Sequence, residues 1–234
     1  MKKAESKSII IIGLVILTLV ILISCNNVTT PENSQTNFKY ENSGEIHNEV
    51  CAFVMENKVK GEHLTIGQII EGVRMFGEEN NYSEEFINSS IDCTISKFIE
   101  LNIITVVNGE FTFKENAEIN PLDFWYSIRP NLNDFEIEKL EGVVLQICNN
   151  EISAEEAHQL MIELDQTLKN FDYELAYKCL MMIDVYLHSD DFWFEDNNKL
   201  SRDSTIILID FICSECCGPL AGAVGSCIAA EYVK

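Results

Sequence analysis

The chain has 234 residues, of which 47% are hydrophobic, and only 4 prolines and 11 glycines, which is the composition of a folding polypeptide. It carries 16 Lys and Arg against 38 Asp and Glu, a net charge of −22. This charge argues against nucleic acid as a partner, because phosphate binding needs a basic face. The motifs of serine hydrolases, zinc proteases and phosphate-binding loops do not occur in the sequence, which favours a protein without standard enzymatic activity.

The N-terminus has three features in order: a basic start, an apolar run and a cysteine. Lys2, Lys3 and Lys7 precede an apolar run over residues 9–23, which ends in Leu22-Ile23-Ser24-Cys25. The run is shorter than the roughly 20 residues that a membrane-spanning helix needs. The segment resembles the signal peptide and lipobox of bacterial lipoproteins. The alternative is an uncleaved membrane helix with an incidental cysteine.

The resemblance implies that residues 1–24 are removed and that Cys25 becomes a lipidated N-terminus. The lipid, with palmitate-type acyl chains, would anchor the protein to the cell membrane or the outer membrane, facing outside the cytoplasm. Cleavage removes three lysines and one glutamate, which changes the net charge from −22 to −24. Anionic headgroups would repel such a surface, so the anchor must hold the protein. Residues 25–42 are then the lipidated cysteine and a flexible polar tether.

A helical period of apolar residues dominates from residue 43 onward. It begins with Ile46, Val50 and Val54 on one face. Thr65 and Gln68 form a capping box for a second helix, and Ser83 starts a third.

A β-hairpin is predicted near 103–113, where residues 104–107 and 110–113 flank Asn108-Gly109. Helices followed by a hairpin suggest a winged-helix DNA reader. Residues 61–120 hold only Arg74, Lys97 and Lys114 as cations, however, which favours a structural flap.

Helical patterns resume at Asn120-Pro121 and continue to the end of the chain. The last of them, over residues 203–232, is expected to bend at Gly218-Pro219. The sequence therefore predicts a mainly α fold: one domain over 43–234 with about eight helices, one hairpin and a glycine-rich C-terminal helix at 219–232. The Gly-Glu-Ile-His-Asn opening at 44–48, a Phe-Trp pair and the glycine-rich tail are similar to those of uncharacterised exported helical bacterial proteins, a resemblance that supplies no activity.

The cysteines are expected mainly as small buried hydrophobes. This holds for the four that are scattered singly, Cys51, Cys93, Cys148 and Cys179, although an exported protein can also pair them. A C-terminal group has the spacing of a metal or iron–sulfur site and also of a helix face: Cys213, Cys216, Cys217 and Cys227. Packing is favoured over a metal or a local disulfide, so no cofactor is expected.

Three further groups of residues carry alternatives. His47 and Cys51 share a helix face at i, i+4, which suits a metal site or a thiolate–imidazole pair, but a solvated or locally bonded histidine is favoured. An acidic stretch offers oxygen ligands for calcium: Asp190, Asp191, Glu195, Asp196 and Asp203. Its spacing does not match a twelve-residue calcium loop, so acids that face water are favoured. Trp125 and Trp193 suit sugar stacking, but core anchoring of both is favoured.

The tail from 216 to 230 has no charge and a ladder of small residues, formed by Gly218, Gly222, Gly225 and Ala229, with Ala221 beside it. Such spacing lets helices approach closely. We expect the tail to dock on the domain. Together with the N-terminal anchor and the absence of catalytic motifs, a docked tail predicts a lipid-anchored, non-enzymatic binding or interaction domain whose protein or small-ligand partner is unknown. The alternative is a membrane-active or oligomerising protein acting through its tail. A hydrolase or metal enzyme remains open if distant residues converge.

Overall fold

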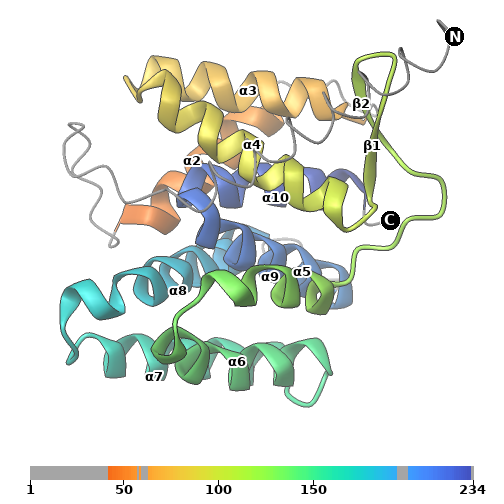
Figure 1. Ribbon diagram of the computed structural model, residues 1–234. Helices are drawn as coiled ribbons and strands as arrows, with labels where there is room; N and C mark the ends of the chain where they lie inside the picture. The colour runs from red at the N-terminus through yellow and green to blue at the C-terminus, as the bar shows by residue number, and fades with distance from the viewer. Residues whose placement is uncertain (1–41, 57, 59–62, 194–199, 233–234) are drawn as a thin grey trace, which may run out of the picture. The chain divides into compact units, whose positions relative to one another are not determined.

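The computed structural model describes residues 42–56, 58, 63–193 and 200–232 (Figure 1). These belong to one compact unit, Asn37–Lys234. Cys25, the signal-like segment and the tether up to residue 41 lie outside the described residues. The predicted mainly α fold is confirmed: the described residues form nine α-helices and one two-stranded antiparallel hairpin.

The first three helices precede the hairpin, and six follow it. They are α2 (Ser43–Glu56), α3 (Ile66–Glu79) and α4 (Glu84–Glu100), then β1 (Ile104–Val107) and β2 (Glu110–Phe113). The later elements are α5 (Pro121–Ile128) with the short 3-10 turn η2 (Arg129–Asn131), α6 (Asp134–Cys148), α7 (Ala154–Leu168), α8 (Tyr173–Trp193), α9 (Leu200–Cys217) and α10 (Pro219–Tyr232). The count is nine because the predicted bend at Gly218 is a full break. Gly218 has a φ of +78°, and Pro219 starts a new helix.

Helix starts follow the sequence signals. Capping boxes are present at Thr65 with Gln68, at Asn133 with Glu136 and at Ser153 with Glu156.

Helix ends use asparagine in the left-handed region. Asn81, Asn102 and Asn150 have φ values of 60°, 64° and 54°, and each directly follows a C-cap residue. After α4, the Ile103 amide donates to the Phe98 carbonyl at 2.9 Å, which is the six-residue closure of a Schellman motif.

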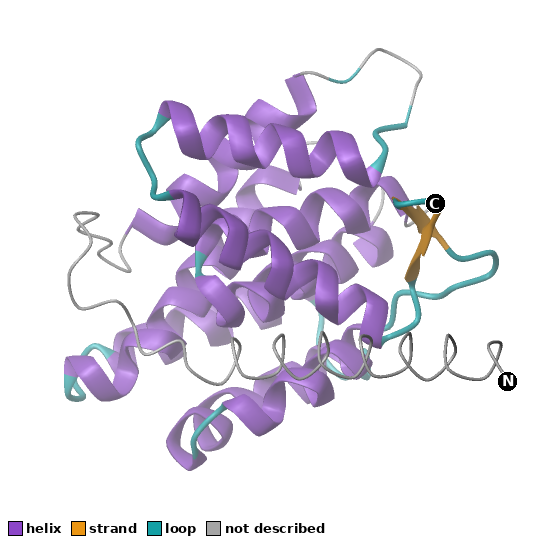
Figure 2. Cartoon of the chain, turned by 45° about the horizontal axis from the view of Figure 1, so that its top comes forward, coloured by secondary structure: helices purple, strands orange, loops and turns teal. Residues whose placement is uncertain are grey.

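The hairpin forms at the predicted Asn-Gly turn. Val107 pairs with Glu110, and Asn108 and Gly109 have φ values of 53° and 89°, as a two-residue primed turn requires. The hairpin lies at the flank of the helices (Figure 2). Its second strand contacts the end of α10 through the rings of Phe113 and Tyr232, whose centroids are 4.6 Å apart.

Helix α10 occupies the interior of the domain, packed against α9, α2, α4 and α3 (Figure 1). Every residue from Pro219 to Glu231 is buried. Its backbone is also held from α4, because the Thr94 hydroxyl donates to the Ala221 carbonyl at 3.0 Å. The predicted glycine-rich C-terminal helix is therefore a core element. No helix among the described residues combines the length and apolarity needed to cross a bilayer.

Candidate functional site

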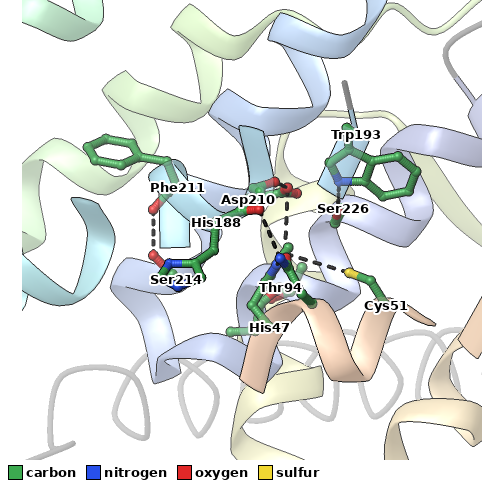
Figure 3. Close-up of polar contacts among 12 residues, drawn as sticks. His47, Cys51, Thr94, His188, Trp193, Asp210, Phe211, Ser214 and Ser226 are labelled. Carbon is green, nitrogen blue, oxygen red and sulfur yellow. Dashed lines mark hydrogen bonds and ion pairs between the residues drawn. The ribbon is translucent and has the colours of Figure 1, made fainter. Parts of the chain in front are cut away.

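A group of polar side chains is buried where α2, α8, α9 and α10 meet (Figure 3). We call it the buried polar cluster, and its members are His47, Cys51, Ser189, Asp210 and Ser226. Each of these residues is 0% exposed. Burial of this many polar groups is costly unless they are hydrogen-bonded to one another, so their geometry decides what the cluster can do.

Glycines bring the helices close enough to form the cluster. At Gly44, a Cβ atom would lie 2.3 Å from His188 Nδ1, so only glycine lets α2 cross α8 there. Two bonds fix this crossing: the Gly44 amide donates to Asp184 Oδ2 at 2.8 Å, and Asn48 Nδ2 donates to the His188 carbonyl at 2.8 Å. At Gly222, a Cβ atom would lie 3.3 Å from His47 Cδ2, so a small residue in α10 leaves room for the imidazole.

His47 stands at the centre of the cluster. Its Nε2 atom lies 3.6 Å from Cys51 Sγ and 3.5 Å from Asp210 Oδ2, and its Nδ1 atom lies 3.0 Å from Asn48 Oδ1. The Ser189 hydroxyl donates to the same Asp210 oxygen. The i, i+4 pair of His47 and Cys51 that the sequence predicts on one helix face is therefore brought into contact.

A second arm of the cluster starts at the end of α8. Trp193 Nε1 donates to Ser226 Oγ of α10 at 3.1 Å. Trp193 thus anchors the end of its helix on α10, and Trp125 is 0% exposed. A tryptophan buried to that degree offers no ring face to a sugar, so Trp125 fits the anchoring interpretation. Trp193 is half-buried, and its hydrogen bond to α10 fits the same interpretation.

Burial dominates the electrostatics of the cluster. It raises the pKa of Asp210 to about 8, against hydrogen bonds from Ser189, Ser226 and Trp193 that lower it. It also raises the pKa of the Cys51 thiol well above its usual range. For His47, burial lowers the pKa, but the neighbouring Cys51 and Asn48 outweigh that effect and the net direction is upward. At neutral pH the carboxyl and the thiol therefore keep their protons.

This arrangement does not suit nucleophilic catalysis. A reactive cysteine needs a thiolate and access to substrate, whereas Cys51 is a buried thiol. In a catalytic triad, one ring nitrogen of the histidine contacts the nucleophile and the other contacts the carboxylate. In this cluster, the same nitrogen of His47 faces both Cys51 and Asp210. One carboxyl oxygen, Asp210 Oδ1, has no hydrogen-bond partner among the described residues. The histidine, cysteine and carboxyl group do converge, but in a closed position, so they fit a role in holding α2 against α9 and α10.

The four C-terminal cysteines separate in the structure. Cys216 is joined by a disulfide to Cys93 of α4, with Cα atoms 6.2 Å apart. Cys213 is buried against Gly225, and Cys227 is buried beside Cys51. Cys217 is half-buried. Among the described residues, no group of three His, Cys, Asp or Glu side chains is placed to hold a metal ion.

The disulfide corrects the expectation at two positions, because the sequence favoured packed thiols at both Cys93 and Cys216. The spacing along the chain gave no signal for this pair, since 123 residues separate Cys93 from Cys216 and only the packing of α4 on α9 brings them together.

The small-residue ladder lies inside the domain. Gly218 lies near Met181, with 3.6 Å between Sδ and a hypothetical Cβ atom. Gly222 lies between His47 and the Asp210 carbonyl, and Ala229 is 0% exposed.

The remaining histidines and acids form pairs at other places. Glu231 of α10 accepts from Lys58 and lies 2.9 Å from His63 Nδ1. His158 Nδ1 lies 2.5 Å from Asp190 Oδ2, which uses one of the acids considered for calcium. Glu195 and Asp196 lie outside the described residues, as do the side chains of Asp191 and Asp203.

The sequence carried no pattern for three members of the cluster: Ser189, Asp210 and Ser226. One available signal was the position of Asp210, a lone charge in the apolar run from Ile206 to Cys213. An isolated acid on a buried stretch indicates a specific polar contact.

Comparisons with protein-family models, curated proteins and solved structures gave no match to this chain.

Proposed function

We propose that this protein is a lipid-anchored bacterial protein that faces outside the cytoplasm and acts through binding or interaction, without catalysis. The N-terminal lipobox carries the proposal of the anchor. It is supported by the bond between Cys93 and Cys216, because structural disulfides persist in oxidising compartments and are rare in the cytosol. Lipidation at Cys25 and formation of a structural disulfide both require export from the cytoplasm, so the two features agree.

The closed state of the buried polar cluster favours binding over catalysis. Its five members are wholly buried, and its thiol and carboxyl are protonated at neutral pH. Binding then has to use the surface. A partner surface is also consistent with the acidity of the chain, whose net charge of −22 gives long-range attraction for cationic molecules.

One surface segment combines aromatic and acidic side chains. Phe171, Tyr173 and Leu175 are 42%, 51% and 42% exposed, and all of residues 169–175 are exposed. Asp172 and Glu174 alternate with them. We call residues 171–175 the aromatic segment; it joins α7 to the first turn of α8.

A cationic and apolar segment of a partner protein fits this place. Residues 134–175 hold 11 Asp and Glu against 2 Lys, so the surrounding surface is acidic. The rings also accept a cation from within the chain, because Lys139 Nζ lies 5.5 Å and 5.4 Å from the ring centroids of Phe135 and Phe171. We therefore propose a partner that presents Lys or Arg beside apolar side chains.

The alternative function, through a membrane-active or oligomerising tail, has less support. It needs a detached apolar helix, whereas α10 is packed between α9, α2 and α4, and Gly222 and Gly225 both face neighbouring helices.

The anchor is tested by labelling cells that express the full chain with a radioactive fatty acid. The wild type should incorporate label and lose residues 1–24, whereas Cys25→Ala should incorporate none and remain uncut. Cys148→Ala is the matched control, because Cys148 is another cysteine that is not fully buried. Equal label in the wild type and in Cys25→Ala would overturn the anchor.

A further inference from the structure

Two buried cysteines that the disulfide between α4 and α9 does not use lie side by side on α2 and α10. Cys51 and Cys227 are each 0% exposed, and the two helices pack directly against each other. Gly222 of α10 faces His47 of α2. Cys51 comes four residues after His47 on α2, and Cys227 comes five residues after Gly222 on α10. Beyond the cysteines, Lys58, just after α2, bonds to Glu231 near the end of α10, so the two helices run in the same direction and Cys51 and Cys227 lie between two contacts that join them. Both are free thiols in the structure, and a hydrogen bond with Cys227 adds to the effect of burial on the pKa of Cys51.

A proton acceptor stands beside this pair. His47 Nε2 lies 3.6 Å from Cys51 Sγ, and Asp210 Oδ2 lies 3.5 Å from the same nitrogen. The imidazole can take the thiol proton when the sulfur reacts, because only the thiolate attacks a disulfide. Cys213 of α9 is also buried, but it faces Gly225, and no histidine contacts it among the contacts described.

We propose that Cys51 and Cys227 form a second interhelix disulfide, which ties α2 to α10 as Cys93 and Cys216 tie α4 to α9. The inference rests on the proposed function for its oxidant, which is a disulfide compound of an oxidising extracytoplasmic compartment. Both bonds would then join the first helices of the domain to its last two. A bond across 176 positions restricts the unfolded chain strongly, which suits a domain exposed outside the cytoplasm.

The reaction is a pair of thiol–disulfide exchanges. The Cys51 thiol gives its proton to His47, and its sulfur attacks a disulfide R–S–S–R, releasing R–S⁻ and leaving a mixed disulfide. The protonated His47 gives this proton to the released R–S⁻. The Cys227 thiol then loses its proton to His47, its sulfur attacks Cys51 Sγ and displaces the second R–S⁻, and that R–S⁻ takes the proton from His47. In sum, two thiols and R–S–S–R become one protein disulfide and two R–SH. Since both cysteines are buried in the folded domain, the exchanges belong to folding, before α10 closes on α2.

Peptide mapping of the full chain, purified from membranes and alkylated at once at acidic pH, tests the pair. Trypsin places Cys51 in peptide 40–58, Cys93 in 75–97, and both Cys216 and Cys227 in 203–234. The proposal predicts that disulfides join all three peptides in a single species, and that reduction with dithiothreitol separates them. Recovery of peptide 40–58 with an alkylated Cys51, beside a linked pair of 75–97 and 203–234, would overturn it.

Two variants assign the bond within peptide 203–234. Cys227→Ala should release peptide 40–58 and keep 75–97 attached, whereas the matched control Cys213→Ala should keep all three peptides together. A Cys227→Ala protein that still holds peptide 40–58 would assign Cys51 to another cysteine and reject the pair.

A second arm separates this inference from the proposed function. The full chain is reduced, unfolded and refolded with reduced and oxidised glutathione, which supplies the oxidant independently of location. Formation of both bonds in this arm, with neither bond in protein taken from cells, would contradict export and leave the pairing of Cys51 with Cys227 intact. Formation of the Cys93–Cys216 bond alone, in both arms, would reject the pairing.

Discussion

Gly225 of α10 lies directly against Cys213 of α9. A Cβ atom on Gly225 would stand 2.7 Å from the Cys213 Sγ atom and 3.0 Å from its Cβ atom. Real Cβ contacts are not that short, so the two helices approach as closely as they do only because residue 225 has no side chain.

Replacement of Gly225 by alanine should therefore destabilise the domain. The added methyl group must displace Cys213 or the helix that carries it, at a cost of about 1–3 kcal/mol in the free energy of unfolding. Gly142→Ala is the matched control. It lies in the middle of α6, where a Cβ atom meets nothing within 4 Å, and it should stabilise the domain by about 0.5–1 kcal/mol. Urea unfolding measures both variants, and equal effects of the same sign would contradict the packing of α10 on α9.

Removal of residues 219–234 should cost far more. The deletion takes away Leu220, Val224 and Ile228, each 0% exposed, and burial of each such side chain is worth about 1.5–3 kcal/mol. That sum approaches the whole stability of a small domain. Circular dichroism during thermal unfolding, on the unlipidated unit from residue 37, should show loss of the cooperative transition. A deleted protein with an unchanged melting temperature would instead favour a detached tail.

Asp210 should make the domain less stable as the pH rises. Its pKa is about 8 in the folded state and about 3.9 in an unfolded chain. Between these values the folded state keeps a proton that the unfolded state has lost, so its contribution to stability falls by at most about 1.4 kcal/mol per pH unit and levels off above pH ~8. Asp210→Asn removes this dependence on pH. In urea unfolding, the free energy of unfolding of the variant relative to that of the wild type should therefore increase from pH ~4 to pH ~8.

Glu141 supplies a control with the opposite sign. A hydrogen bond from Arg129 lowers the pKa of Glu141, with the guanidinium nitrogen 2.6 Å from the carboxylate. Its contribution is present above the unfolded pKa and is lost as the pH falls through the folded pKa. Glu141→Gln should therefore differ from the wild type only at the higher pH values and in the destabilising direction. The same trend with pH for both variants would refute the assignment of a protonated Asp210.

The aromatic segment should bind basic amphipathic peptides. Tyr173→Ser with Leu175→Ser removes two exposed apolar side chains and should weaken binding of a fluorescent Lys- and Leu-rich peptide at least about tenfold, the loss of 1.4 kcal/mol. High salt should weaken the wild-type complex, because acidic residues surround the site. Met75→Ser, at another exposed apolar residue, is the control and should leave affinity unchanged. Equal affinity of the double variant and the wild type would exclude this segment as the binding surface.

Local structure was readable from the sequence because its causes are local. The capping boxes at Thr65 and Ser153 and the Asn108-Gly109 turn each depend on residues within a few positions of one another, and helices and hairpin form there as predicted. The face shared by His47 and Cys51 was predictable for the same reason, since residues four apart are neighbours on a helix.

Tertiary packing decided what those elements do. The sequence alone determined the elements of a mainly α domain and a small-residue helix at its end. The partner of Cys93, the contact of Asp210 with His47 and the neighbours of Gly222 depend on helices far apart in the chain. Such pairs have no fixed spacing, because they follow from which faces the helices bury together. Burial then sets the chemistry of the cluster by raising the pKa of its carboxyl and of the Cys51 thiol, and burial is a property of the assembled helices that no single segment carries.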